Sequence, residues 1–171
     1  PNLAQLKTVT CNDCPIELMN FSGCSSLQYL NLQGVTTNAI IGNKLHINKY
    51  NQAESLTIDV SNTTLDHIFV CRSEILAYLD VSKNTQLKHL EVYVNPNLKS
   101  IDVSTLVNLE ILDLGDCDLT NLDVSKNLML TELYVTNNKL STIDVSQNKQ
   151  LKVLKCKGNQ ISNLNVSNNE K

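Results

Sequence analysis

Two short hydrophobic patterns alternate along the chain, and each returns about every 21 residues. The first pattern reads I/L-D/N-V-S and begins at Ile58, Leu79, Ile101, Leu122, Ile143 and Leu164. The second pattern reads L-x-L or similar and begins at Phe69, Leu90, Leu112, Leu133 and Leu154. Within each pattern apolar and polar residues alternate, which is typical of a short strand with one buried face. Towards the N-terminus, Val9 and Leu30 fall in the second pattern.

A strand of a few residues cannot bury its apolar face alone, but stacked repeats can bury such faces in one continuous core. The repeat therefore predicts a mainly β solenoid of about eight coils, roughly 4.8 Å apart, with short parallel strands on both sides and little helix. Residues 1–171 are expected to form a single repeat array that is a fragment or module of a larger protein. The pattern blurs around residues 35–57, where we expect an irregular coil.

The recurring L-x-x-L-x-L-x-x-N half-unit resembles the leucine-rich repeat family, and in particular its 21-residue bacterial subclass with nested half-repeats. That subclass is common in surface proteins of Bacteroidetes. The resemblance covers nearly the whole chain and implies an extracellular or cell-surface setting.

Asparagine is the residue that marks the turns, since the chain holds 27 Leu and 23 Asn but only five Gly. Asn tolerates left-handed backbone conformations and forms hydrogen bonds to nearby backbone groups. Two ladders of stacked Asn are predicted, one through Asn84, Asn127, Asn148 and Asn169, the other through Asn95, Asn138 and Asn159.

The six cysteines fit the same register. Cys11, Cys71 and Cys156 take inward strand positions, whereas Cys14, Cys24 and Cys117 take ladder positions. We therefore expect structural thiols, with Cys71, Cys117 and Cys156 unbridged because they lie two or more coils apart. The C-x-x-C at Cys11 and Cys14 leaves a zinc or redox role open, and a bridge between Cys14 and Cys24 is conceivable.

The outward positions of the first pattern, which we name the D-V-S face, barely change between copies. Asp and Ser recur there at Asp59, Asp80, Asp102, Asp123 and Asp144 and at the serines two residues later. Such uniformity predicts a local structural role, with Ser hydroxyls and backbone amides offsetting the repulsion between stacked carboxylates. A row of carboxylates that collects Ca²⁺ is the alternative.

The outward positions of the second pattern, which we name the varied face, differ from coil to coil. Ile68, Val70 and Arg72 are expected to point outward there, and Gly115 is expected to leave a dip between Tyr93 and Tyr134. Tyrosine is favoured in recognition surfaces because it combines a large apolar area with a hydroxyl group. The predicted ligand-binding residues are Tyr29, Arg72, His89, Glu91, Tyr93, Asp113, Tyr134, Thr136, Lys155 and Lys157.

Composition narrows the function further. The net charge of −3 and the lack of a Lys/Arg-rich run disfavour nucleic-acid binding. No apolar run approaches the roughly 20 residues of a membrane span, and no glycine-rich phosphate loop or catalytic motif is present. The sequence thus predicts a non-enzymatic module without cofactor or bound metal, which recognises a protein, host or bacterial, or less favourably a glycan. The alternative is a structural spacer or stalk of a bacterial cell-surface protein.

Overall fold

The computed structural model describes Gln5 and residues 8–10, 29–31, 55–57, 67–69, 77–82 and 84–169. Within these residues all regular secondary structure is β, in nine strands of three residues each. Seven of them form one parallel sheet in the order β1-β2-β4-β6-β7-β8-β9. Their bounds are β1 Thr8–Thr10, β2 Tyr29–Asn31, β4 His67–Phe69, β6 His89–Glu91, β7 Ile111–Asp113, β8 Glu132–Tyr134 and β9 Val153–Lys155.

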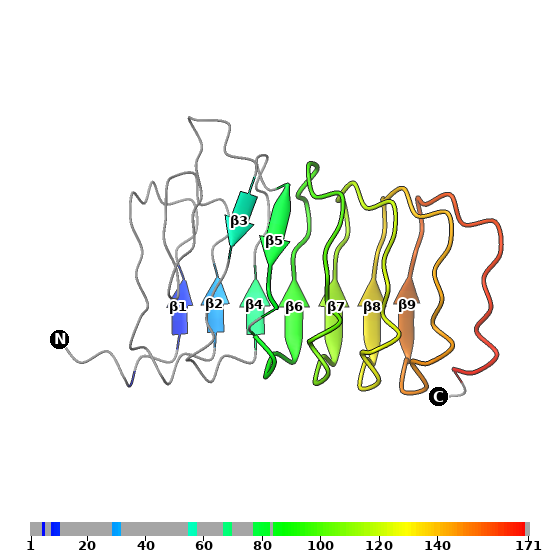
Figure 1. The fold of residues 1–171 in the computed structure, drawn as a ribbon. Helices are drawn as coiled ribbons and strands as arrows, with labels where there is room; N and C mark the ends of the chain where they lie inside the picture. The colour runs from blue at the N-terminus through cyan, green and yellow to red at the C-terminus, as the bar shows by residue number, and fades with distance from the viewer. Residues whose placement is uncertain are drawn as a thin grey trace.

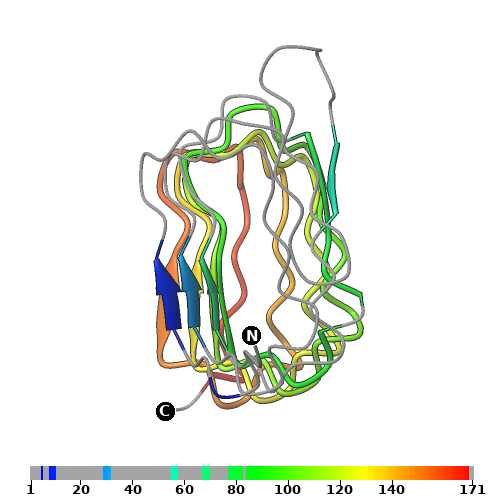
Figure 2. The ribbon, with the colours of Figure 1, turned by 90° about the vertical axis from the view of Figure 1, so that its left-hand side faces the viewer.

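A second parallel sheet pairs β3 (Ser55–Thr57) with β5 (Tyr78–Asp80). Figure 1 shows the strands of the large sheet side by side, with the coils stacked in sequence order. Seen along the stack, β3 lies on the side opposite β1 and β2, so the sheets form two walls of one solenoid (Figure 2). The predicted mainly β solenoid with parallel strands is confirmed.

The second wall is only partly built of strands. From Ile101 onward the D-V-S segments are extended turns. In each of them the Ser amide donates to the side chain two residues earlier, as Ser125 N–H does to Asp123 Oδ1 at 2.8 Å. Asp80 of β5 accepts the Ser82 amide in the same way at 2.9 Å, so this bond is compatible with strand pairing and repeats along the described part of this wall.

The core lies between the walls and is filled by the inward residues of both patterns. Leu90, Leu112 and Leu133, at the centres of β6, β7 and β8, are fully buried, and Val103 and Val124 meet them from the D-V-S side. Because every coil contributes the same positions, the core continues from coil to coil as the repeat predicts.

Both predicted asparagine ladders are present in the described coils. Asn148 Nδ2 donates to the carbonyls of Val124 and Asn127 in the preceding coil, each at 2.9 Å. On the other corner, Asn138 Nδ2 donates to Leu114 O at 2.8 Å and its Oδ1 accepts from Leu119 N–H. These side chains thus supply hydrogen bonds to turn groups that are buried between coils.

Among the described residues, two ladder positions are not asparagine. Leu106 takes the first-ladder position of its coil and is fully buried. Cys117 takes a second-ladder position, and its thiol donates to Val92 O at 3.2 Å, much as an Asn amide would. Cys117 and Cys156 are free thiols, and burial raises the pKa of Cys117 to about 11. Cys11, Cys14, Cys24 and Cys71 lie outside the described residues, so their roles stay predictions.

The register of β3 and β4 corrects the sequence analysis. Ile68, not Phe69, pairs with Leu90, and Ile68 is fully buried rather than outward. Likewise Leu56, not Ile58, pairs with Leu79. The segment around 35–57 lies outside the described residues except for β3, so its irregular coil stays a prediction.

Candidate binding face

The varied face is the outer surface of the large sheet, and its middle row is built by the strand register. Glu91 lies beside Asp113, Asp113 beside Tyr134, and Tyr134 beside Lys155. Parallel strands lie about 4.8 Å apart, so this row juxtaposes two acids, an aromatic ring and a base within a few coils. Four of the predicted ligand-binding residues are therefore brought together as one surface.

His67 joins this surface, although the sequence analysis did not place it there. Its Nε2 lies 2.9 Å from Glu91 Oε1, and its ring meets the ring of His89 edge to face with centroids 5.0 Å apart. The corrected register explains this, because burial of Ile68 turns His67 outward next to His89. One acid is thus bracketed by an imidazole pair on one side and by Asp113 on the other.

Asp113 is a half-buried acid of the varied face. Its Oδ1 accepts from the Gly115 amide at 2.9 Å. Burial raises the pKa of Asp113 above its ordinary value; the hydrogen bond from Gly115 opposes the rise, and the neighbouring charge of Glu91 adds to it. Burial has removed part of the water that would stabilise the ionised form of this carboxylate. A positively charged group of a partner would supply that stabilisation instead.

The expected dip at Gly115 is not found. Gly115 is buried, and its neighbour in the next coil is Thr136 rather than Tyr134. A Cβ at Gly115 would lie 3.0 Å from Thr136 Oγ1 and 3.3 Å from Asp113 Oδ1. Side chains thus fill the space over Gly115, and the face is continuous from Tyr93 to Thr136.

Tyr134 is held in a fixed orientation. Its hydroxyl donates to Glu132 Oε2, and the Lys155 ammonium lies 4.8 Å from the centre of its ring. The hydrogen bond to Glu132 raises the pKa of Tyr134. A ring held by a hydrogen bond and a cation–π contact loses little entropy on binding a partner.

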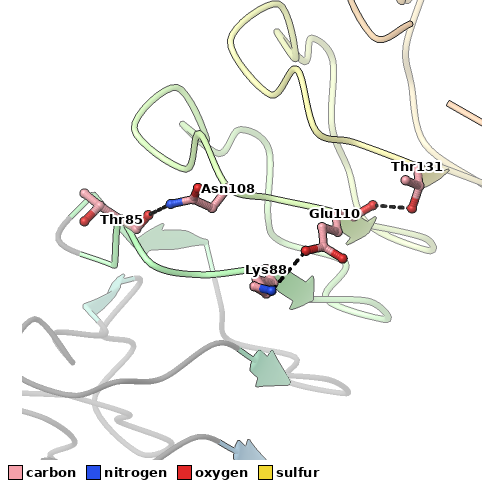
Figure 3. Close-up of polar contacts among 5 residues, drawn as sticks. All are labelled: Thr85, Lys88, Asn108, Glu110 and Thr131. Carbon is pink, nitrogen blue, oxygen red and sulfur yellow. Dashed lines mark hydrogen bonds and ion pairs between the residues drawn. The ribbon is translucent and has the colours of Figure 1, made fainter. Parts of the chain in front are cut away.

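Contacts between coils border the strands of the varied face (Figure 3). Lys88 Nζ lies 3.2 Å from Glu110 Oε1, and Thr131 Oγ1 donates to Glu110 O at 3.0 Å. Asn108 Nδ2 donates to Thr85 O at 3.0 Å, and this bond links the coil of Lys88 to the coil of Glu110. Exposed ion pairs contribute about 0–1 kcal/mol each, so this edge aligns the coils more than it stabilises them.

The contacts above do not include three of the predicted ligand-binding residues, Lys157, Tyr29 and Arg72. Lys157 is exposed and occupies, in the next coil, the position equivalent to Thr136. Tyr29 belongs to β2, and nothing is described of its side chain, while Arg72 lies outside the described residues. Within the described residues, no three His, Cys, Asp or Glu side chains are grouped so that they could hold a metal ion. The same residues include no helix with the length and apolar character to cross a membrane.

Parallel coils around one core, joined by asparagine ladders, define a β solenoid of stacked leucine-rich repeats. Comparison with solved structures agrees. The fold is similar to the functional domain of internalin InlJ from Listeria monocytogenes, which includes a cysteine ladder, with 23% identity, a TM-score of 0.50 and coverage of 98% of this chain and 43% of that one. The chain thus has the fold of the leucine-rich repeat proteins.

Two further structures support this fold. Internalin C2 of Listeria monocytogenes is 20% identical with a TM-score of 0.58, over 97% of this chain and 76% of that one. A leucine-rich repeat protein of Leptospira interrogans is 19% identical with a TM-score of 0.57, over 92% and 44%. The chain therefore spans less than half of the InlJ and Leptospira structures. No protein-family model and no curated protein matches the sequence.

Proposed function

We propose that this chain is a non-enzymatic recognition module that binds a protein through its varied face. The observation that carries the proposal is the contrast between two faces on one repeating backbone. The D-V-S face repeats one Asp-to-Ser turn, whereas the varied face presents a different set of side chains in every coil. Solenoids of this kind bind partners through extended surfaces.

The composition of the varied face supports a protein as the partner. Tyr93 and Tyr134 supply aromatic area, and Glu91 and Asp113 supply acceptors beside them. Aromatic side chains surrounded by polar groups are frequent at protein interfaces. A ligand with Lys or Arg opposite Asp113 and an apolar residue against Tyr134 would match this order of groups. The similarity to internalins favours a bacterial cell-surface or secreted setting.

A structural spacer is the second candidate, and the repeated turns of the D-V-S face favour it. A spacer needs a regular stack but no particular side chains on the varied face. The two functions therefore differ in what removal of exposed tyrosines does.

The double variant Tyr93→Ala with Tyr134→Ala tests the proposal. Parent and variant are immobilised and exposed to host and bacterial surface extracts, and retained proteins are identified by mass spectrometry. An anchor aromatic contributes about 2 kcal/mol or more at an interface, so partners of the parent should be lost. The control, Lys126→Ala with Gln147→Ala, removes two exposed side chains at or beside the D-V-S face and should retain them.

Melting temperatures of both variants establish that each remains folded. If the tyrosine variant retains every protein that the parent retains, the varied face is a solvated surface and the spacer function replaces the proposal.

A further inference from the structure

The D-V-S side of the solenoid, opposite the varied face, carries a groove of about 530 Å³. It is lined by a column of residues at one equivalent position of successive coils, directly before the Leu or Ile that begins each D-V-S segment. That column begins with Tyr78 in β5 (Figure 1) and continues with Ser100, Asn121 and Thr142. One large ring followed by three small polar side chains leaves a hollow that runs along the stack and is closed at one end by the ring.

The wall beside this column is formed by Asp102, Asp123 and Asp144. Each carboxylate accepts the amide N–H of the Ser two residues on, at 2.8–2.9 Å. Bonds from these serines lower the pKa of all three groups, so the wall is ionised. A carboxylate has room for about four hydrogen bonds, so each retains capacity for a ligand donor in a fixed direction.

The floor and the end of the groove are partly apolar. Ile101 and Leu122 are half-buried between the two polar columns, and Tyr78 is 52% exposed. The groove thus offers an exposed ring face, an apolar floor, hydroxyl and amide groups that both donate and accept, and carboxylates that accept. A sugar ring has the matching parts, with an apolar C–H face and hydroxyls around its edge.

The spacing of the groups separates a glycan from an extended peptide. Equivalent groups repeat once per coil, at about 4.8 Å, whereas side chains on one face of an extended peptide repeat every ~6.6 Å. A peptide would fall out of step after one or two coils. A pyranose ring is close to one coil spacing in length, so a β-linked oligosaccharide can present one ring to each coil. Three ionised carboxylates exclude an anionic glycan.

We propose that this groove binds a neutral β-linked oligosaccharide, which lies along the stack with one ring against Tyr78 and its hydroxyls bonded to Asn121 and the Asp wall. The site is separate from the varied face and does not depend on the proposed protein ligand.

Titration calorimetry with neutral β-linked hexasaccharides (cellohexaose, mannohexaose and N-acetylchitohexaose) tests this site on the full chain. We expect at least one to bind, and Tyr78→Ala to weaken that binding about tenfold or more through loss of the stacked ring. Asp123→Asn tests the wall. It keeps the turn, because Asn165 accepts the Ser167 amide in the same way at 3.0 Å, but it removes the charge and one acceptor, and should weaken binding less.

Tyr134→Ala on the varied face is the matched aromatic control and should leave sugar binding unchanged, whatever it does to protein capture. Melting temperatures confirm that each variant is folded. Binding of hexalysine but of no sugar would overturn the proposal in favour of a cationic peptide. The absence of binding by all three sugars at millimolar concentration, or equal binding by the Tyr78 variant, would also overturn it.

Discussion

Asp113 on the varied face and Asp123 on the D-V-S face make the same local bond and behave in opposite ways. Each accepts the amide two residues on, from Gly115 at 2.9 Å and from Ser125 at 2.8 Å. Yet the pKa of Asp113 is raised by burial, and the pKa of Asp123 is lowered by the bonds from Ser125. The turn is the same, so the difference comes from what surrounds it: half-buried side chains and Glu91 in one case, open water in the other.

The comparison teaches that this backbone separates architecture from surface chemistry. The Asp turn is a structural device on both faces, and the ladders and core hold the coils in place beneath them. Evolution of the outward side chains can then change the electrostatics of one face without altering the stack. Variants that disturb the stack should therefore affect both faces, whereas variants of the acids should affect only one.

The largest effect is expected from breaking a ladder, since both faces rest on it. Asn148→Ala removes two hydrogen bonds and leaves the carbonyls of Val124 and Asn127 buried without that donor. Each carbonyl keeps one backbone donor, the Asn127 amide for Val124 and the Leu130 amide for Asn127. The change therefore removes two hydrogen bonds that contribute about 0.5–1.5 kcal/mol each, and we expect a loss of about 2 kcal/mol in the free energy of unfolding, measured by urea denaturation.

Gln147→Ala is the control for this change, because Gln147 is the exposed residue directly before Asn148. It should alter the free energy of unfolding by less than about 0.5 kcal/mol. An Asn148 variant as stable as this control would mean that the ladder bonds add nothing net to the stack.

A smaller effect is expected at the turn that leaves the varied face. Val94, Asp116, Asn137 and Gly158 occupy the position before the second ladder, and each has a positive φ, from 51° to 75°. A β-branched side chain is the least suited to this conformation, whereas Asn adopts it readily. Val94→Asn should therefore raise the free energy of unfolding by about 0.5–1 kcal/mol in urea denaturation.

Asn137→Val is the reverse change at the equivalent position of a later coil. It should lower the free energy of unfolding by more than the first change raises it, because it also removes the 2.7 Å bond from Asn137 Nδ2 to Asp116 Oδ1. Destabilisation by Val94→Asn would show that the packing of Val94 outweighs its backbone strain.

The sequence predicted most of the stack because strict alternation fixes which residues point inward. Leu90, Leu112 and Leu133 are buried as expected, and so are Asn95 and Asn138 in the ladder. The predicted register was wrong at residues 67–69. Ile68, Phe69 and Val70 are all apolar, so the sequence pattern does not fix which of them points inward, and a shift of one residue exchanges the two faces. That error hid the contact between His67 and Glu91.

The groove could not be predicted from the repeat either. Its hollow depends on one residue, Tyr78, at a position that holds small polar residues in the following coils. A repeat pattern reports what the copies share, while the groove arises where one copy differs. The filled space over Gly115 was missed for a related reason, since a glycine reveals nothing of the side chains that fold over it.

The smallest effect, and the direct test of the two-face comparison, is a pair of Asp→Asn changes measured by melting temperature against pH. Folding lowers the pKa of Asp123, which stabilises the native state at every pH above the pKa of the unfolded chain, about 3.9. This contribution is lost as the pH falls through the pKa of the folded state. Asp123→Asn should therefore lower the melting temperature at pH 7, and this difference from the parent should be smaller at pH 2.5.

Asp113→Asn should do the opposite at neutral pH. Raising of the pKa of Asp113 on folding gives a contribution that is present below the unfolded value and is lost as the pH rises through the folded one. Removal of that charge should raise the melting temperature at pH 7 relative to its value at pH 2.5, both taken against the parent. Asn keeps the acceptor for the Gly115 amide, so the turn itself is unaltered. Shifts of the same sign for both variants would show that the turn, and not its surroundings, determines how each face responds to charge.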